Sequence, residues 1–182
     1  RVFAGGVLTS RTFVFDLREP LEGRLLRVDE PNGRRRFWAP HDYVTLPNGN
    51  VIGAFSDPAR ARGEPRELLA APGGLVEFTA DGTFVREMSA IDAEAKYLIA
   101  APNGAAVSTQ LGRLVTTSTA KGYAPTMQGE RVPGISVQVW RWPTVKLAHT
   151  VILPAGPRGE ENLGPLVPRF LRSKPFVLVN TD

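Results

Sequence analysis

Two histidines are the side chains of this sequence best suited to metal binding or to proton transfer near neutral pH. The sequence has no cysteine, which excludes disulfides, cysteine-ligated zinc and thiol catalysis within these 182 residues. His41 follows Pro40 and precedes Asp42 and Tyr43. At the opening of a strand it could present an imidazole as a metal ligand, with the Tyr43 phenol on the same side of the strand. The alternative is an imidazole that only hydrogen-bonds neighbouring backbone groups.

The remaining chemistry-bearing residues favour structural roles. His149 lies in an apolar alternating run, on one face of the strand or on a partly exposed edge, and we expect it to be packed and hydrogen-bonded rather than a ligand. Glu160 and Glu161 with Asn162 could bind a divalent cation through oxygen atoms, although adjacent carboxylates more often belong to a solvated loop. The sequence contains no phosphate-binding loop, serine-hydrolase elbow or zinc-protease helix motif.

Composition places the chain among soluble globular proteins. It is 42% hydrophobic and 22% charged with a formal charge of +4, which excludes a disordered chain, and no apolar run is long enough to predict a membrane span. Arg34, Arg35 and Arg36 stand beside two aromatic residues, but they follow a turn sequence and no second basic cluster extends them, so we expect no nucleic-acid partner. The first residue is arginine, so we expect the natural start to be missing, and the location, cytoplasmic or periplasmic, stays open.

Short apolar or alternating runs separated by turn residues predict an all-β fold. The 18 glycines and 16 prolines agree with many turns. Three turns are predicted, at 47–49, 80–82 and 102–104, from the sequences Pro-Asn-Gly, Ala-Asp-Gly and Pro-Asn-Gly. Twelve strands are predicted: 12–17, 25–29, 42–46, 51–55, 75–79, 84–88, 97–101, 105–109, 137–142, 146–153, 166–171 and 176–180.

The strand types recur in order, which predicts a repeat architecture. Phe15, Phe78 and Trp140 take equivalent places in three strands, 63 and 62 residues apart. Propeller blades recur every ~40 to 50 residues, so blades with long insertions at 59–72, 89–96, 119–134 and 154–165 fit this spacing. The prediction is a β-propeller of four-stranded blades, with about three blades in a single domain at 1–182 that is a fragment of a larger propeller. A free-standing β-sandwich is the alternative.

The ordered motifs resemble the selenium-binding protein family, which includes the bacterial methanethiol oxidases and consists of seven-bladed β-propellers. The resemblance runs through nearly the whole chain. It is carried by Leu8-Thr9-Ser10-Arg11-Thr12-Phe13-Val14-Phe15-Asp16, Ala39-Pro40-His41, Leu46-Pro47-Asn48-Gly49-Asn50-Val51, Gly73-Gly74-Leu75-Val76-Glu77-Phe78, Val107-Ser108-Thr109 and Val139-Trp140-Arg141-Trp142.

The resemblance implies a copper site, and selenium as a second candidate cofactor. His41 stands at the first of the family's copper-associated histidines, whereas Val44 and Asn103 stand where the family has two others, and Thr45 stands at its cysteine. Asp57 matches an aspartate that follows the same strand, so Asp57 and Tyr43 are candidate binding residues and His41 is the candidate metal ligand.

Two functions follow from this resemblance. Because valine offers no donor atom, the first is a non-catalytic propeller that binds a small molecule or a protein. The alternative is copper-dependent oxidation of a small thiol. A carboxylate-based sugar- or lipid-modifying propeller is a third possibility, for which the sequence offers no inward pair of carboxylates.

Overall fold

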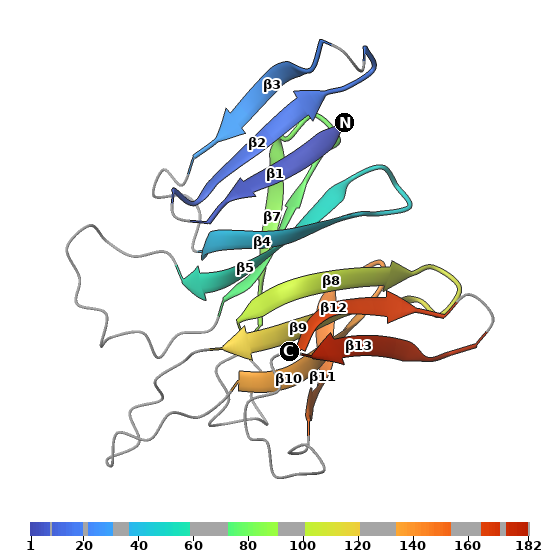
Figure 1. The fold of residues 1–182 in the computed structure, drawn as a ribbon. Coiled ribbons are helices and arrows are strands. Elements are labelled where there is room, and N and C mark those ends of the chain that lie inside the picture. Colours follow the sequence, from blue (N-terminus) through green and yellow to red (C-terminus); the bar gives the residue numbers. More distant parts are fainter. Residues whose placement is uncertain are drawn as a thin grey trace, which may run out of the picture.

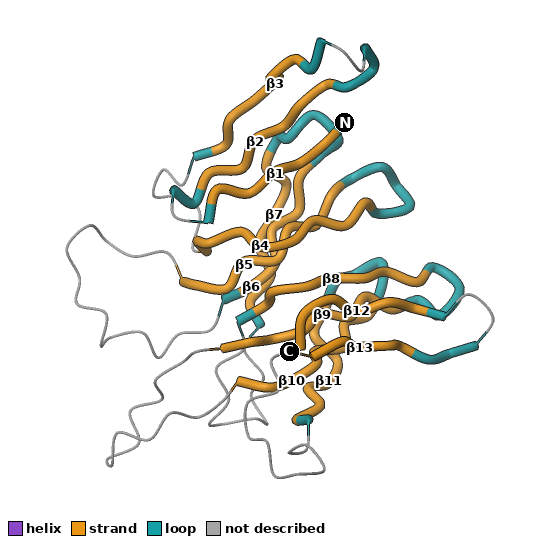
Figure 2. Tube along the Cα trace, in the orientation of Figure 1, coloured by secondary structure: helices purple, strands orange, loops and turns teal. Residues whose placement is uncertain are grey.

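The regular structure of the protein is entirely β in the part of the chain that is described (Figure 2). The structure is a computed structural model, which describes residues 1–7, 9–19, 22–30, 37–58, 73–90, 101–120, 134–153, 165–171 and 174–181. Within these ranges there are 13 strands, all paired antiparallel, and no helix that could span a membrane.

The strands form four sheets that follow one another along the chain (Figure 1). In every sheet, strands adjacent in sequence are adjacent in space. The first sheet contains β1 (Val2–Gly6), β2 (Arg11–Asp16) and β3 (Arg24–Asp29). The second contains β4 (Phe37–Thr45), β5 (Val51–Pro58), β6 (Gly74–Phe78) and β7 (Phe84–Ser89). The third contains β8 (Pro102–Ser108), β9 (Arg113–Ala120), β10 (Gly134–Arg141) and β11 (Lys146–Ile152), and the fourth β12 (Pro165–Phe170) and β13 (Val177–Thr181).

The same β-bulge recurs in three sheets, directly before an aromatic residue. The register shifts before Phe15 in the β2–β3 pair, before Phe78 in β6–β7 and before Trp140 in β10–β11. The prediction that these three residues occupy equivalent places is therefore confirmed. It follows that β1, β2 and β3 correspond to the second, third and fourth strands of the next two sheets.

A second recurring bulge marks the pairs formed by the first two strands of a sheet. It lies between Pro40 and Asp42 in β4–β5, between Pro102 and Gly104 in β8–β9, and begins at Pro165 in β12–β13. Proline has no N–H to donate to the ladder, so it is tolerated at such irregular positions. The fourth sheet thus begins in the same way as the second and third.

Successive sheets pack face to face in chain order. β4 packs against β8 and β8 against β12, while β1, β5 and β9 pack against the first strand of the following sheet. Between the second and third sheets lies an apolar core in which Ile52, Leu75 and Trp140 are buried. A smaller aromatic core, with Phe55 and Phe78 at its centre, lies in the second sheet and is covered by Phe3 of the first.

Two of the three predicted turns are confirmed. The Gly49 N–H donates to the Leu46 carbonyl at 3.0 Å, the Gly82 N–H donates to Thr79 at 2.9 Å, and both glycines have a positive φ that favours glycine. The turn predicted at 102–104 is wrong, because these residues open β8 and carry its bulge.

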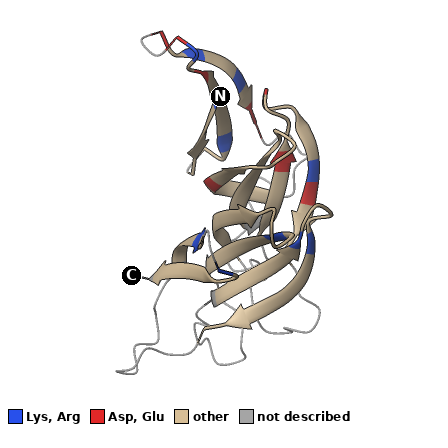
Figure 3. Cartoon of the chain, turned by 90° about the vertical axis from the view of Figure 1, so that its right-hand side faces the viewer, with Lys and Arg blue, Asp and Glu red and all other residues tan. Residues whose placement is uncertain are grey.

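Eleven of the twelve strand predictions are confirmed, and two strands, β1 and β9, were not predicted. The strand predicted at 97–101 falls almost entirely outside the described residues, as do the basic run 34–36, the acidic pair 160–161 and nearly all of the predicted insertions. In the view of Figure 3, the charged residues that are drawn are scattered over several strands.

Candidate functional site

Strand β4 carries both His41 and Tyr43, and its bulge places the two side chains in different environments. The bulge leaves His41 outside the paired register, between Pro40 and Asp42. His41 is exposed, and its Nε2 lies 2.9 Å from the Ser56 Oγ of the neighbouring strand β5. Because a bulge turns a side chain away from the regular alternation, it accounts for the outward position of the imidazole.

The bulge in β8 leaves Asn103 outside the register in the same way as His41. His41 and Asn103 therefore occupy equivalent bulge positions in β4 and β8, two strands that pack against each other. The strands are joined there by a side chain, because Asp42 Oδ2 accepts a hydrogen bond from the Ala105 N–H at 2.9 Å. Val44, in contrast, packs against the core between the second and third sheets.

The described residues contain no group of three or more histidine, cysteine, aspartate or glutamate side chains that could hold a metal ion. Asp57 lies in β5 and its backbone pairs with Trp38, but its side chain lies outside the described part of the structure. His149 is exposed on β11, so it is not packed as expected, and of the two placements left open it takes the one at an exposed edge. The reason is that β11 is an edge strand of the third sheet.

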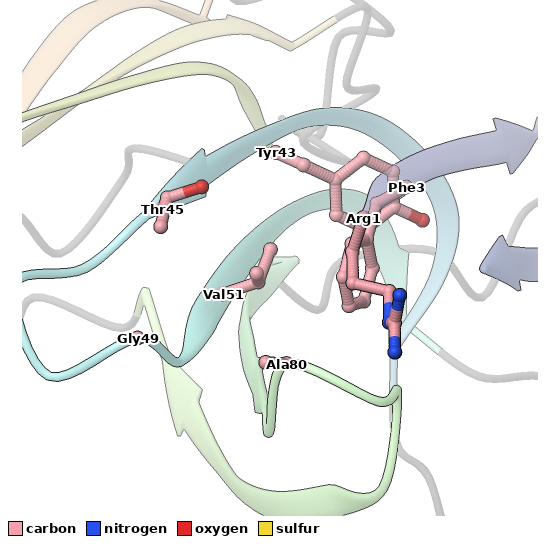
Figure 4. A pocket seen from close by; sticks show the side chains of 7 residues that line it. All are labelled: Arg1, Phe3, Tyr43, Thr45, Gly49, Val51 and Ala80. Atoms are coloured by element: carbon pink, nitrogen blue, oxygen red, sulfur yellow. The ribbon is translucent and has the colours of Figure 1, made fainter. Parts of the chain in front are cut away.

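Tyr43 lines a pocket of about 420 Å³ between the first two sheets (Figure 4). Its ring lies 5.6 Å from the ring of Phe3, centroid to centroid, and its hydroxyl shares a 2.7 Å hydrogen bond with the hydroxyl of Thr12. The Tyr43 side chain is therefore held by a ring contact and by a hydrogen bond of its hydroxyl group. The lining residues are Arg1, Phe3, Tyr43, Thr45, Gly49, Val51 and Ala80.

The pocket forms where β1 approaches β4 closely. A Cβ added to Gly5 would lie 2.9 Å from the Pro40 carbonyl oxygen, so a side chain at this position would push the two strands apart. The rim is formed by the two confirmed turns, through Gly49 in one and Ala80 in the other. The pocket thus depends on β1, β4, β5 and the β6–β7 turn together.

One carboxylate and two guanidinium groups set the charge at the Arg1 side of the pocket. Arg18 Nε lies 3.1 and 3.0 Å from the Asp16 Oδ1 and Oδ2, and Arg18 Nη2 lies 2.7 Å from Oδ2. Arg1 Nη1 reaches Oδ1 at 2.6 Å. The hydrogen bonds from Arg18, and then the charge of Arg1, hold the pKa of the Asp16 carboxyl well below its usual range. The cluster therefore keeps one net positive charge at neutral pH.

Sequence reasoning found Tyr43 but missed its partners in the site. Phe3 belongs to β1, which was not predicted, and Arg1 directly precedes this strand. Thr12 and Asp16 lie in a predicted strand, but the sequence does not show which strand packs against it. The only local signal is the Asp16-Leu17-Arg18 spacing, which brings two opposite charges together just after a strand.

Comparisons with protein-family models and with curated proteins find no match to this chain.

Proposed function

We propose that the protein is a non-catalytic binding protein whose sheets are blades of a β-propeller of the selenium-binding-protein type. Propellers are built from four-stranded antiparallel sheets that succeed one another and pack face to face around an axis. The meander order of the sheets, their two recurring bulges and the contacts between first strands support this proposal. The free-standing sandwich would leave these repeats unexplained.

The pocket at Tyr43 is the observation that carries the binding function. Its volume of about 420 Å³ lies within the range of roughly 300–1,000 Å³ usual for small-molecule sites. Its seven lining residues combine two aromatic rings and Val51 with the polar groups of Arg1 and Thr45, and include no histidine, carboxylate or thiol for proton transfer or covalent catalysis. Binding without chemistry is therefore the activity that this pocket supports best.

The binding function is tested by a screen of small-molecule fragments with protein-detected NMR. We expect bound fragments to shift the amide signals of Phe3, Tyr43 and Val51. Ala80→Phe, which places a ring at the exposed rim, should abolish this binding, whereas Ala148→Phe on the exposed surface of β11 should leave it unchanged. Fragments that bind Ala80→Phe as well as the wild type, or no binding at these amides, would refute the proposed pocket function.

Copper-dependent thiol oxidation is the competing function, and His41 distinguishes the two. We expect no stoichiometric copper in the reconstituted wild-type protein or in His41→Ala. His149→Ala is the matched control, because this histidine is also exposed but lies on a distant strand. One copper per chain that is lost in His41→Ala and kept in His149→Ala would establish a metal site and favour the oxidase.

A further inference from the structure

We propose that the pocket at Tyr43 selects a small aromatic carboxylate, an inference that rests on the proposed binding function and adds the chemical class of the ligand. Two observations carry it. The first is the unbalanced positive charge at one side of the pocket, and the second is the arrangement of aromatic surface beside it.

The net positive charge results from two guanidinium groups, those of Arg1 and Arg18, that share the single carboxylate of Asp16. Arg18 engages both carboxylate oxygens, whereas Arg1 reaches one of them with Nη1. A guanidinium has five N–H donors, so Arg1 retains donors for the oxygens of a bound carboxylate. Only about a third of its side chain is exposed, with a relative exposure of 31%, so an ion pair there is less screened than at an open surface.

The negative charge in the rim turn is offset by its own neighbours. Asp81 follows Ala80 in the rim turn, and it accepts hydrogen bonds from Thr79 and Thr83 and feels the positive charge of Arg27. These interactions hold the pKa of Asp81 below its usual value, so it stays ionised but compensated. Asp81 therefore does not cancel the net positive charge beside Arg1.

The apolar wall suits a flat ring. Phe3 and Tyr43 are half-buried and tilted by 43° to one another, and Phe3 also stands 6.1 Å from Phe78. Aromatic rings prefer such offset or tilted neighbours, so a ligand ring can pack against this cluster with Val51 beside it. In Figure 4 the Arg1 guanidinium lies at one side of these rings and the Thr45 hydroxyl at the other.

Paired ligands test this selectivity directly. Benzoate and benzamide have nearly the same shape but differ in charge, and NMR titration measures both dissociation constants. We expect benzoate to bind at least about tenfold more tightly, the effect of one charge-assisted hydrogen bond. Arg1→Gln should remove this preference, so that benzoate and benzamide bind with equal affinity, and Arg1→Lys should keep part of it. Arg113→Gln, an exposed arginine on β9, is the control and should change neither affinity.

The outcomes separate the two proposals. Equal binding of benzoate and benzamide that Ala80→Phe abolishes would overturn the carboxylate selectivity and keep the binding function. A preference for benzoate that survives in Arg1→Gln would overturn the role of Arg1. Binding of neither ligand, while other fragments still occupy the pocket, would overturn the ligand class alone.

Discussion

Asp42→Asn should weaken the packing of the second sheet against the third. Asp42 Oδ1 accepts a hydrogen bond from the Tyr43 N–H at 2.8 Å, and Oδ2 accepts one from the Ala105 N–H of β8 at 2.9 Å. Asparagine has the same shape but only one acceptor oxygen. Whichever way its amide is turned, one of the two backbone N–H groups faces an NH₂ group.

The cost follows from the burial of the two donors. A buried donor left without a partner costs about 1–3 kcal/mol. Ala105 is only 8% exposed, so water cannot easily replace the carboxylate there, and we expect the asparagine oxygen to stay with Ala105 and abandon the half-buried Tyr43 N–H. The loss of the charged acceptor adds to this penalty. We therefore expect the free energy of unfolding to fall by about 2 kcal/mol.

Two measurements check this prediction. Urea unfolding followed by tryptophan fluorescence reports the global effect, since Trp140 is buried in the core between these sheets. Hydrogen exchange reports the local effect, and we expect faster exchange of the Tyr43 amide. Glu22→Gln makes the same chemical change on an exposed side chain and should alter stability by less than about 0.5 kcal/mol. An Asp42→Asn protein with wild-type stability and unchanged exchange at both amides would refute the inter-sheet hydrogen bond.

Three further substitutions test other parts of the structure. Gln138→Leu removes the buried partner of the Thr116 and Ser136 hydroxyls and should cost about 2 kcal/mol in urea unfolding, whereas Gln110→Leu on an exposed turn should cost little. Gly74→Ala would place a Cβ 2.4 Å from both the Met88 carbonyl oxygen and the Phe37 ring, and calorimetry should show the destabilisation of about 1–3 kcal/mol typical of overpacking. Asp16 has a lowered pKa, so its stabilising contribution is present above about pH 4 and is lost as the pH falls further through the folded-state pKa. The difference in melting temperature between the wild type and Asp16→Asn should therefore shrink below about pH 4, and a constant difference from pH 2 to 7 would contradict this reasoning.

The strands with apolar alternation could be predicted from the sequence, and β9 shows why others could not. The buried residues of β9 include Thr116, Thr117 and Ser118, which read as polar and exposed in isolation. Their hydroxyls are satisfied only by distant partners, such as Gln138 for Thr116. A run of polar residues can be buried only where such partners satisfy its hydroxyls. The local hydrophobic periodicity of the sequence does not show where these partners are.

The two Pro-Asn-Gly sequences show the same limit for turns. In the first, Gly49 has φ +85° and closes a turn onto Leu46. In the second, Gly104 is in a strand, and its N–H donates to the Thr117 Oγ1 at 3.1 Å. The tripeptide tolerates both conformations, and the pairing with β9 decides between them. The candidate pocket was similarly beyond the sequence, because it joins Arg1 and Phe3 to residues some forty positions away.

Strand β4 connects the candidate pocket to the rest of the molecule through consecutive residues. Alternation sends neighbouring side chains to opposite faces, so Asp42 and Val44 face the third sheet while Tyr43 faces the first. The Tyr43 hydroxyl meets Thr12 of the first sheet, and its N–H meets the same carboxylate that holds β8. The Asp42 carboxylate therefore contacts both a residue of the candidate pocket and the first strand of the third sheet.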